Sequence, residues 1–337
     1  MKKNEVKPQG PFADSLGFLA PPDMPPIFDP GESPELSVIH VTSVAPFVTD
    51  FNAALENHKK FREQALSNPG TYEVLSKKDL GKPGLGILFG MQHTPPGITK
   101  KKVRELSDAG IRVMSLAYRT STEYGGGFAS RIGLTDRGRE LLQWMGECDI
   151  IPDISHSNNQ TACDTFMFAV GEEIPLVPMA SHSACSYMYP HRRNASGEVL
   201  LWLRELKGYV GIPTVTFMLG PKEAGCHMAA FAAQIRFVTK IMGMENIGIG
   251  SDGIHKNMSM DEARANYLRM QKMLKGKNDP FGAYFPDRIP AAIEEGQKMF
   301  GVLATGLTLH NPHFTEEDIR RICGGNFLSY LSRSLPA

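Results

Sequence analysis

The chain has 337 residues, and its 36 lysines and arginines balance its 36 aspartates and glutamates, so its formal net charge is zero. This balance gives no electrostatic reason to expect nucleic acid or an anionic membrane surface as a partner. Hydrophobic residues make up 42% of the chain, which is enough for the core of one large globular domain. No apolar run approaches the roughly 18 residues that a membrane span requires.

The cysteines and the start of the chain indicate the compartment. Five cysteines are scattered along the chain and form no C-x-x-C pair. An odd, scattered set of this kind is typical of reduced, buried thiols. The basic first residues are not followed by the apolar segment of a signal peptide. We therefore expect a cytoplasmic protein.

The predicted elements follow in chain order. Residues 1–35 are rich in proline, and PPDMPP at 21–26 predicts an extended arm that runs over the surface. From residue 36 to 337, short β-branched runs alternate with helical patterns, which predicts a parallel sheet. The seven predicted strands are 36–41, 85–91, 111–118, 149–155, 175–181, 209–217 and 246–251. An eighth strand near 302–309 would complete a (β/α)8 barrel of a single domain, with a doubly wound sheet as the alternative.

Two helices are especially clear in the sequence. Leu141, Leu142 and Met145 fall on one face of a predicted helix over 136–147. Thr315 is a predicted N-cap, with Asp318 three residues later and apolar residues on the inner face.

Polar side chains follow several of the predicted strands, where a barrel enzyme carries its chemistry. His156 and His182 each follow a serine at the end of an apolar run, and Asp252 follows a third such serine. Imidazoles suit zinc, and a nearby carboxylate can act as a general base toward a metal-bound water. Three other predicted strand ends carry His40, Gln92 and Tyr118, and the run 209–217 ends without an ionisable group. A single histidine would indicate only a core or loop residue, but the convergence of these groups predicts a catalytic site.

Four segments of the chain resemble the membrane (renal) dipeptidase family of zinc hydrolases. They are GLTDRGRELLQWMGECDIIPDISHSNNQTACDTF, PLVPMASHSACSYMYPHRRN, MENIGIGSDG and FTEEDIRRICGGNFL, in this order between about residues 85 and 330. The resemblance implies a (β/α)8 barrel of the amidohydrolase superfamily, and it implies that His156 and His182 are metal ligands. It further implies that Arg193, just before Asn194, holds the substrate carboxylate, and that Asp252 is the catalytic aspartate. A guanidinium fork suits a carboxylate on chemical grounds as well.

The chain departs from the family pattern at three other strand ends. The family has an H-x-D pair at the end of strand one, where this chain has VIHVTSV. Either His40 is that histidine and Thr42 replaces the aspartate, or His40 lies two places early and both ligands are missing. Gln92 replaces the glutamate that bridges two zinc ions, as in a bacterial branch of the family, and Tyr118 replaces a histidine. A neutral amide cannot bridge two dications, so we expect at most one zinc ion, on His156 and His182 with help from His40 or His93.

These observations lead to two hypotheses of function. The first is a metal-dependent hydrolase that cleaves a dipeptide or small amide with a free carboxylate, held by Arg193 with Gln92 and Asn194 beside it. Asp252 would move the proton and Tyr118 would donate to the oxyanion. The alternative is a diverged barrel that binds a small carboxylated ligand without peptidase activity. Arg193 could also serve only to fix its own loop. The family resemblance suggests a homodimer.

Overall fold

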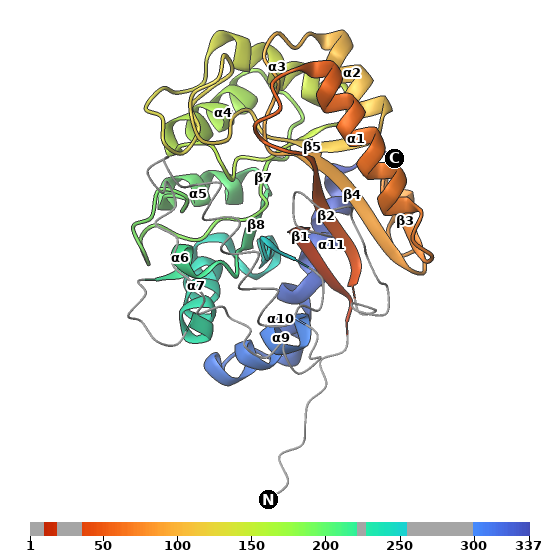
Figure 1. The fold of residues 1–337 in the computed structure, drawn as a ribbon. Coiled ribbons are helices and arrows are strands. Elements are labelled where there is room, and N and C mark those ends of the chain that lie inside the picture. The colour runs from red at the N-terminus through yellow and green to blue at the C-terminus, as the bar shows by residue number, and fades with distance from the viewer. Residues whose placement is uncertain (1–9, 19–35, 221–226, 255–298) are drawn as a thin grey trace, which may run out of the picture.

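The computed structural model describes residues 10–18, 36–220, 227–254 and 299–337 (Figure 1). A ring of parallel strands lies at its centre. The eight strands of the ring are β1 (Phe12–Phe18), β2 (Leu36–Val44), β4 (Leu85–Met91), β5 (Ile111–Met114), β6 (Ile151–Pro152), β7 (Met179–Ala180), β8 (Tyr209–Ile212) and β9 (Ile247–Ile249).

The ring closes through parallel pairing of neighbours in chain order. A parallel bridge between Asp153 and Met179 joins β6 to β7. The short strand β10 (Gly253–Ile254), which follows β9, pairs in parallel with β1. A further strand, β3 (Thr71–Glu73), pairs with β4 outside the ring. The predicted (β/α)8 barrel is confirmed.

Helices surround the ring (Figure 1). In chain order they are α1 (Phe51–Leu66), α2 (Lys100–Asp108), α3 (Asp136–Glu147), α4 (Asn159–Gly171), α5 (Gly197–Glu205), α6 (Thr216–Leu219), α7 (His227–Met242), α9 (Met299–His310), α10 (Glu316–Arg320) and α11 (Asn326–Ser334). Short helical turns occupy Lys77–Asp79, Met244–Asn246 and Arg321–Gly325. The predicted face of α3 is buried, and Thr315 and Asp318 form the predicted capping box of α10.

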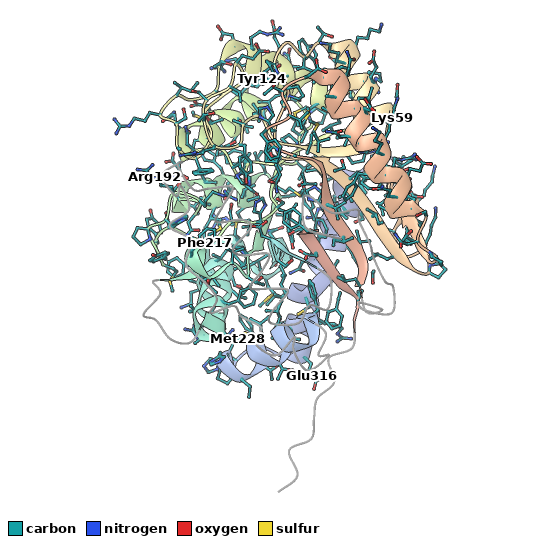
Figure 2. All side chains as sticks on the ribbon, viewed as in Figure 1. Lys59, Tyr124, Arg192, Phe217, Met228 and Glu316 are labelled. Carbon is teal, nitrogen blue, oxygen red and sulfur yellow. The ribbon has the colours of Figure 1, made fainter. Side chains whose placement is uncertain are left out.

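Side chains fill the space inside the ring, so the barrel is a packed core and not a pore (Figure 2). The lower layer is apolar and packs against Phe327 and Tyr330 of α11; its strand residues are Ala13, Val38, Leu88, Val113, Ile151, Met179 and Tyr209. Residues two places further along a strand face the same side. The next layer toward the carboxyl ends is polar on most strands, with Ser15, His40, Ser115, Asp153 and Ser181, all buried. This polar layer lies directly beneath the strand ends that carry the site.

Ser15 ties this layer together across the barrel. Its hydroxyl lies 2.7 Å from the carbonyl oxygen of Ser181 and 2.9 Å from that of Ile249. A Cβ atom at Gly211 or Gly250 would collide with the Ser15 hydroxyl and the Ser181 carbonyl oxygen. Glycine is therefore required at both positions to let β1 approach β7.

Three sequence predictions about the elements are wrong. Of the predicted surface arm over 1–35, Phe12–Phe18 is instead the buried strand β1, and residues 1–9 and 19–35 lie outside the described part. The barrel strands therefore begin before residue 36. The segment predicted as the eighth strand, 302–309, lies in helix α9. The run 209–217 leaves the sheet at Ile212, and Thr216 begins α6.

Candidate active site

Two histidines face each other at the carboxyl end of the barrel. His156 follows β6 and His182 follows β7, and their Nε2 atoms lie 2.9 Å apart. Both side chains are buried. Burial lowers the pKa of each imidazole well below its usual value, and the guanidinium of Arg193 lowers it further. Both rings are therefore neutral at pH 7, which is the form that binds metal ions.

Arg193 reaches this pair from the loop after β7. Its side chain is only 3% exposed, whereas its neighbour Arg192 is exposed at the surface (Figure 2). Nη1 donates to the carbonyl oxygen of Ser155, and Nη2 lies 3.2 Å from Nε2 of His156 and 3.5 Å from the carbonyl oxygen of His182. The guanidinium thus points toward the histidine pair.

Asp252 completes the polar set from the strand end after β9. Its φ of 51° is in the left-handed region, which is uncommon for a residue other than glycine and is found often at functional sites. Burial raises the pKa of its carboxyl group to about 7, against an opposing effect of Arg193. A carboxyl group with this pKa can take up and release a proton near neutral pH.

Tyr118 lies against the histidine pair. Its ring stacks on that of His156, with ring centres 4.0 Å apart. Burial and the charge of Asp252 raise the pKa of Tyr118 to about 12. The phenol therefore keeps its proton and can act as a hydrogen-bond donor.

Gln92 and Asn194 have different surroundings. Gln92 directly follows β4, is buried, and its Nε2 has no partner in the structure. Asn194 donates from Nδ2 to the carbonyl oxygens of Tyr189 and Met218, at 2.8 Å each. Its amide group therefore fixes the loop after β7 to α6, and only its buried Oδ1 has no partner.

Among the described residues, His40 is not grouped with the histidine pair as a third metal ligand, although its charge lowers the pKa of His182. His40 lies in the middle of β2, not at the end of the first strand, and its Nδ1 lies 2.7 Å from the carbonyl oxygen of Ser15. The first strand is β1, whose last residues, Leu16 to Phe18, include no metal-ligating side chain. Both members of the family's H-x-D pair are therefore missing, the second of the two possibilities that the sequence left open.

The donor set fits one ion and not a bridged pair. In the described ranges, no group of three or more histidine, cysteine, aspartate or glutamate side chains is placed to hold a metal ion. The two facing imidazoles supply two nitrogen ligands, one fewer than the three protein ligands of a usual catalytic zinc site. One ion with its remaining positions filled by water or substrate fits this pair.

Sequence reasoning missed Asp153 and Asp14, two buried aspartates below the site. Asp153 accepts hydrogen bonds from the backbone and hydroxyl groups of Ser155 and Ser181. Asp14 of β1 accepts from the backbone and hydroxyl of Ser251. Each aspartate thus holds the serine that precedes a site residue. The repeated Ser-His and Ser-Asp pairs at strand ends were the signal that could have indicated such partners.

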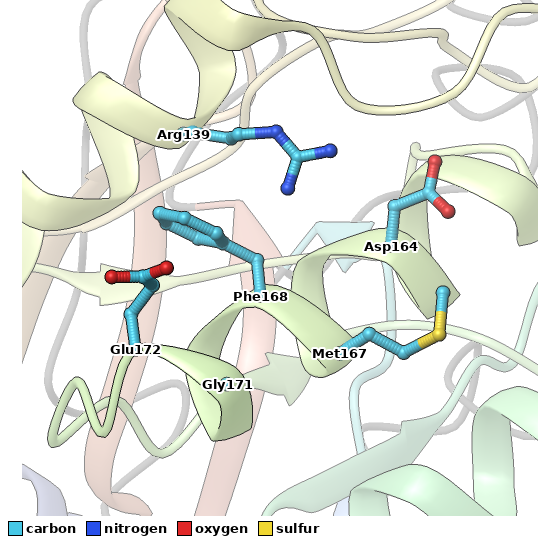
Figure 3. A pocket seen from close by; sticks show the side chains of 6 residues that line it. All are labelled: Arg139, Asp164, Met167, Phe168, Gly171 and Glu172. Carbon is cyan, nitrogen blue, oxygen red and sulfur yellow. The ribbon is translucent and has the colours of Figure 1, made fainter.

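A pocket of about 220 Å³ lies elsewhere, on the outside of the barrel (Figure 3). It is formed by α3 and α4, where the guanidinium of Arg139 lies over the ring of Phe168 at 5.3 Å. It is remote from the strand ends, and we assign no chemistry to it.

The fold and the site together define a barrel of the metallohydrolase type, with a histidine pair, an arginine and an aspartate at the carboxyl ends of its strands. Residues 32–275 match the membrane dipeptidase family (peptidase family M19). The chain belongs to this family.

Similar proteins agree with this assignment. An uncharacterized dipeptidase of Schizosaccharomyces pombe is 24% identical over 57% of this chain and 48% of its own length. Dipeptidase aclJ of Aspergillus oryzae is 28% identical over 44% of this chain and 36% of its own. The matched part thus spans less than half of these relatives.

Solved structures share the fold over nearly the whole chain. An amidohydrolase from Pseudomonas aeruginosa superposes with a TM-score of 0.76 at 22% identity, covering 98% of both chains. A metallo peptidase from Rhodobacter sphaeroides, liganded with a phosphinate mimic of the dipeptide L-Ala-D-Ala, superposes with a TM-score of 0.71 at 16% identity, covering 97% of this chain and 99% of its own. No helix among the described residues is long and apolar enough to cross a membrane.

Proposed function

We propose that the protein is a metal-dependent hydrolase that cleaves a dipeptide or a small amide with a free carboxylate. The observation that carries this proposal is the convergence of His156, His182 and Arg193. Nε2 of His156 lies 2.9 Å from Nε2 of His182 and 3.2 Å from Nη2 of Arg193. Family membership and the site's position at the strand ends support it.

Each residue has a distinct role in the proposed reaction. His156 and His182 hold one divalent ion, for which zinc is the best match to two imidazoles. When bound, such an ion lowers the pKa of a water molecule and polarises the scissile carbonyl group. Asp252 accepts the proton of the attacking water and delivers it to the leaving amine. The Tyr118 hydroxyl donates to the oxygen that becomes negative, and Arg193 binds the substrate carboxylate.

The surroundings of the site agree with these roles. The pKa of Asp252, raised to about 7, lets it alternate between base and acid near neutral pH. Asp252 and Arg193 influence each other's pKa, and the charge of Asp252 raises the pKa of Tyr118, so the proton carrier lies near both the anchor and the donor. At the end of β4, where a second ion would require a carboxylate, Gln92 places a neutral buried amide.

We also propose a cellular location and an oligomeric state for the protein. The four described cysteines, at 148, 163, 185 and 323, are free and buried, which supports the expected cytoplasmic location. A homodimer is proposed from the family resemblance alone.

Hydrolysis of dipeptides tests the proposal. The purified protein, supplied with one equivalent of zinc, should release amino acids from L-Ala-D-Ala or another dipeptide of a panel, and should act poorly on the matching C-terminal amides. Asp252→Asn should remove this activity. Absence of hydrolysis of every dipeptide, although zinc binds, would contradict the proposal.

The described part of the chain supplies only two imidazole ligands, which favours the second candidate function, a barrel that binds a carboxylated ligand without hydrolysing it. The same panel separates the two candidates. Binding of dipeptides that depends on Arg193, without turnover at any zinc concentration, would be the result expected of the binding protein.

A further inference from the structure

We infer that Asp153, acting through the hydroxyl of Ser181, fixes the proton of His182 on Nδ1 and so directs the bare Nε2 of that ring into the site. Asp153 is thereby a positioning residue for the histidine pair. Its effect on metal binding rests on the proposed function, but its effect on the ring does not.

The Asp153 carboxylate is buried at the end of β6 and accepts several hydrogen bonds. Oδ1 accepts from the backbone N–H groups of Ser155 and Ser181, at 3.0 Å each, and from the Ser155 hydroxyl at 2.7 Å. Oδ2 lies 2.6 Å from the Ser181 hydroxyl. An ionised carboxylate only accepts hydrogen bonds, so every one of these partners must donate.

A hydroxyl group has one proton, and that of Ser181 is directed to Oδ2 of Asp153. The Ser181 oxygen also lies 2.7 Å from Nδ1 of His182. Because the serine has no second proton to give, Nδ1 of His182 must be the donor of this hydrogen bond. A neutral imidazole has a single N–H, so with that proton on Nδ1 the Nε2 of His182 is bare.

The unprotonated nitrogen of His182, Nε2, faces the other histidine of the pair. Nε2 of His182 lies 2.9 Å from Nε2 of His156, and an unprotonated imidazole nitrogen is the form that coordinates a metal ion. A metal-ligating histidine commonly donates its other N–H to a carboxylate or carbonyl group, which fixes its orientation. Here the Asp153 carboxylate acts indirectly, through the hydroxyl of Ser181.

The same carboxylate also holds the other half of the pair. Ser155, which Asp153 fixes by two hydrogen bonds, directly precedes His156. The Ser155 hydroxyl accepts from the backbone N–H of His182 at 3.0 Å. One buried carboxylate therefore ties the ends of β6 and β7 together, so that both rings face the same point.

The experiment is nitrogen NMR of the full chain labelled with ¹⁵N-histidine, at a pH slightly above neutral and with metal removed by chelator. The His182 signals are identified by their loss in His182→Gln. We expect a protonated Nδ1 and a bare Nε2 in the natural protein. In Asp153→Asn, the two backbone N–H groups keep the amide oxygen on their side, so the amide N–H donates to Ser181. The Ser181 proton then turns to His182, and the proton of the ring moves to Nε2.

Two further variants keep the inference testable if Asp153→Asn fails to fold. Ser181→Ala removes the hydroxyl that touches the ring and should leave a mixture of both tautomers. Ser155→Ala removes the other hydroxyl from the same carboxylate but none that touches the ring nitrogen, and should leave the proton on Nδ1. Asp14→Asn is the control for loss of a comparable buried aspartate and should also leave it there.

Zinc binding by calorimetry, with zinc alone as the probe, is the second readout. Asp153→Asn should raise the zinc Kd by about 10–100-fold, the usual effect of losing such an outer partner. A natural protein with the His182 proton on Nε2, or equal tautomer changes in Ser181→Ala and Ser155→Ala, would overturn the inference. Neither result depends on whether dipeptides are hydrolysed. A protein that shows the expected tautomers but cleaves no dipeptide would contradict the proposed function alone.

Discussion

Replacement of Arg193 by alanine should weaken the binding of a carboxylated ligand far more than the binding of its amide. The guanidinium is buried beside His156, so its hydrogen bonds to a carboxylate would form with little competition from water. Hydrogen bonds to charged groups contribute about 1.5–3 kcal/mol. At 1.4 kcal/mol per tenfold change, the Kd should rise by about 10- to 150-fold.

The variant should also lose stability, because the guanidinium donates to the carbonyl oxygens of Ser155 and His182. Leaving such buried acceptors without a donor costs about 1–3 kcal/mol of the free energy of unfolding. Arg193→Lys should recover only part of the affinity, because an ammonium group lacks the planar fork.

The assay is calorimetric titration with L-Ala-D-Ala and with its C-terminal amide, for the natural protein, Arg193→Ala and Arg192→Ala. Arg192 is the matched control because it is adjacent in sequence but exposed. A selective loss of the dipeptide in Arg193→Ala alone is expected. Equal weakening of dipeptide and amide, together with a lower melting temperature, would show that Arg193 only supports the loop and would refute the reasoning.

The remaining predictions concern proton transfer, metal content and packing. Asp252→Asn should abolish turnover while dipeptide binding persists. In the natural protein, kcat/KM should rise with pH to a plateau above about 7, where the carboxyl group of Asp252 is ionised. A rate independent of pH between 5 and 8 would contradict this role. Because folded Asp252 keeps its proton between pH about 4 and 7 while the unfolded chain has lost it, the free energy of unfolding should fall as pH rises through this range, and Asp252→Asn should flatten that dependence in urea titrations. Elemental analysis after dialysis should find at most one zinc ion per chain, and two would show that Gln92 does not prevent a second ion. Gly211→Ala should cost about 1–3 kcal/mol by overpacking against Ser15, whereas Gly171→Ala, at an open position on α4, should be neutral or stabilising in the same urea titration.

Most of the barrel could be predicted because most of its strands are continuous apolar runs in the sequence. Runs such as 85–91 are continuous and apolar, as expected of strands buried on both faces, and the structure has β4 at those residues. Strand β1 was hidden because its inward positions carry Ser15 and Gly17 in place of large apolar residues, and the Ser15 hydroxyl donates to backbone carbonyl groups of other strands. The apolar segment 302–309 was mistaken for a strand because a buried helix and a buried strand both give short apolar runs.

The site residues could be predicted where they directly follow a strand that is recognisable in the sequence. His156 and His182 were identified from their position after Ser155 and Ser181, and the structure brings their rings together. His40 was misplaced because the missed first strand shifted the strand count by one. Asp153 could not be assigned from sequence, since its role depends on contacts across two strands that only the fold brings together.

His156 and His182 are proposed to hold one metal ion together. Anomalous diffraction at the zinc absorption edge, from crystals of the protein loaded with zinc, tests it directly. We predict one anomalous peak per chain, within bonding distance of both Nε2 atoms, about 2.0–2.1 Å. A peak bound by other residues, two peaks at the strand ends, or no peak between these imidazoles at saturating zinc would contradict it.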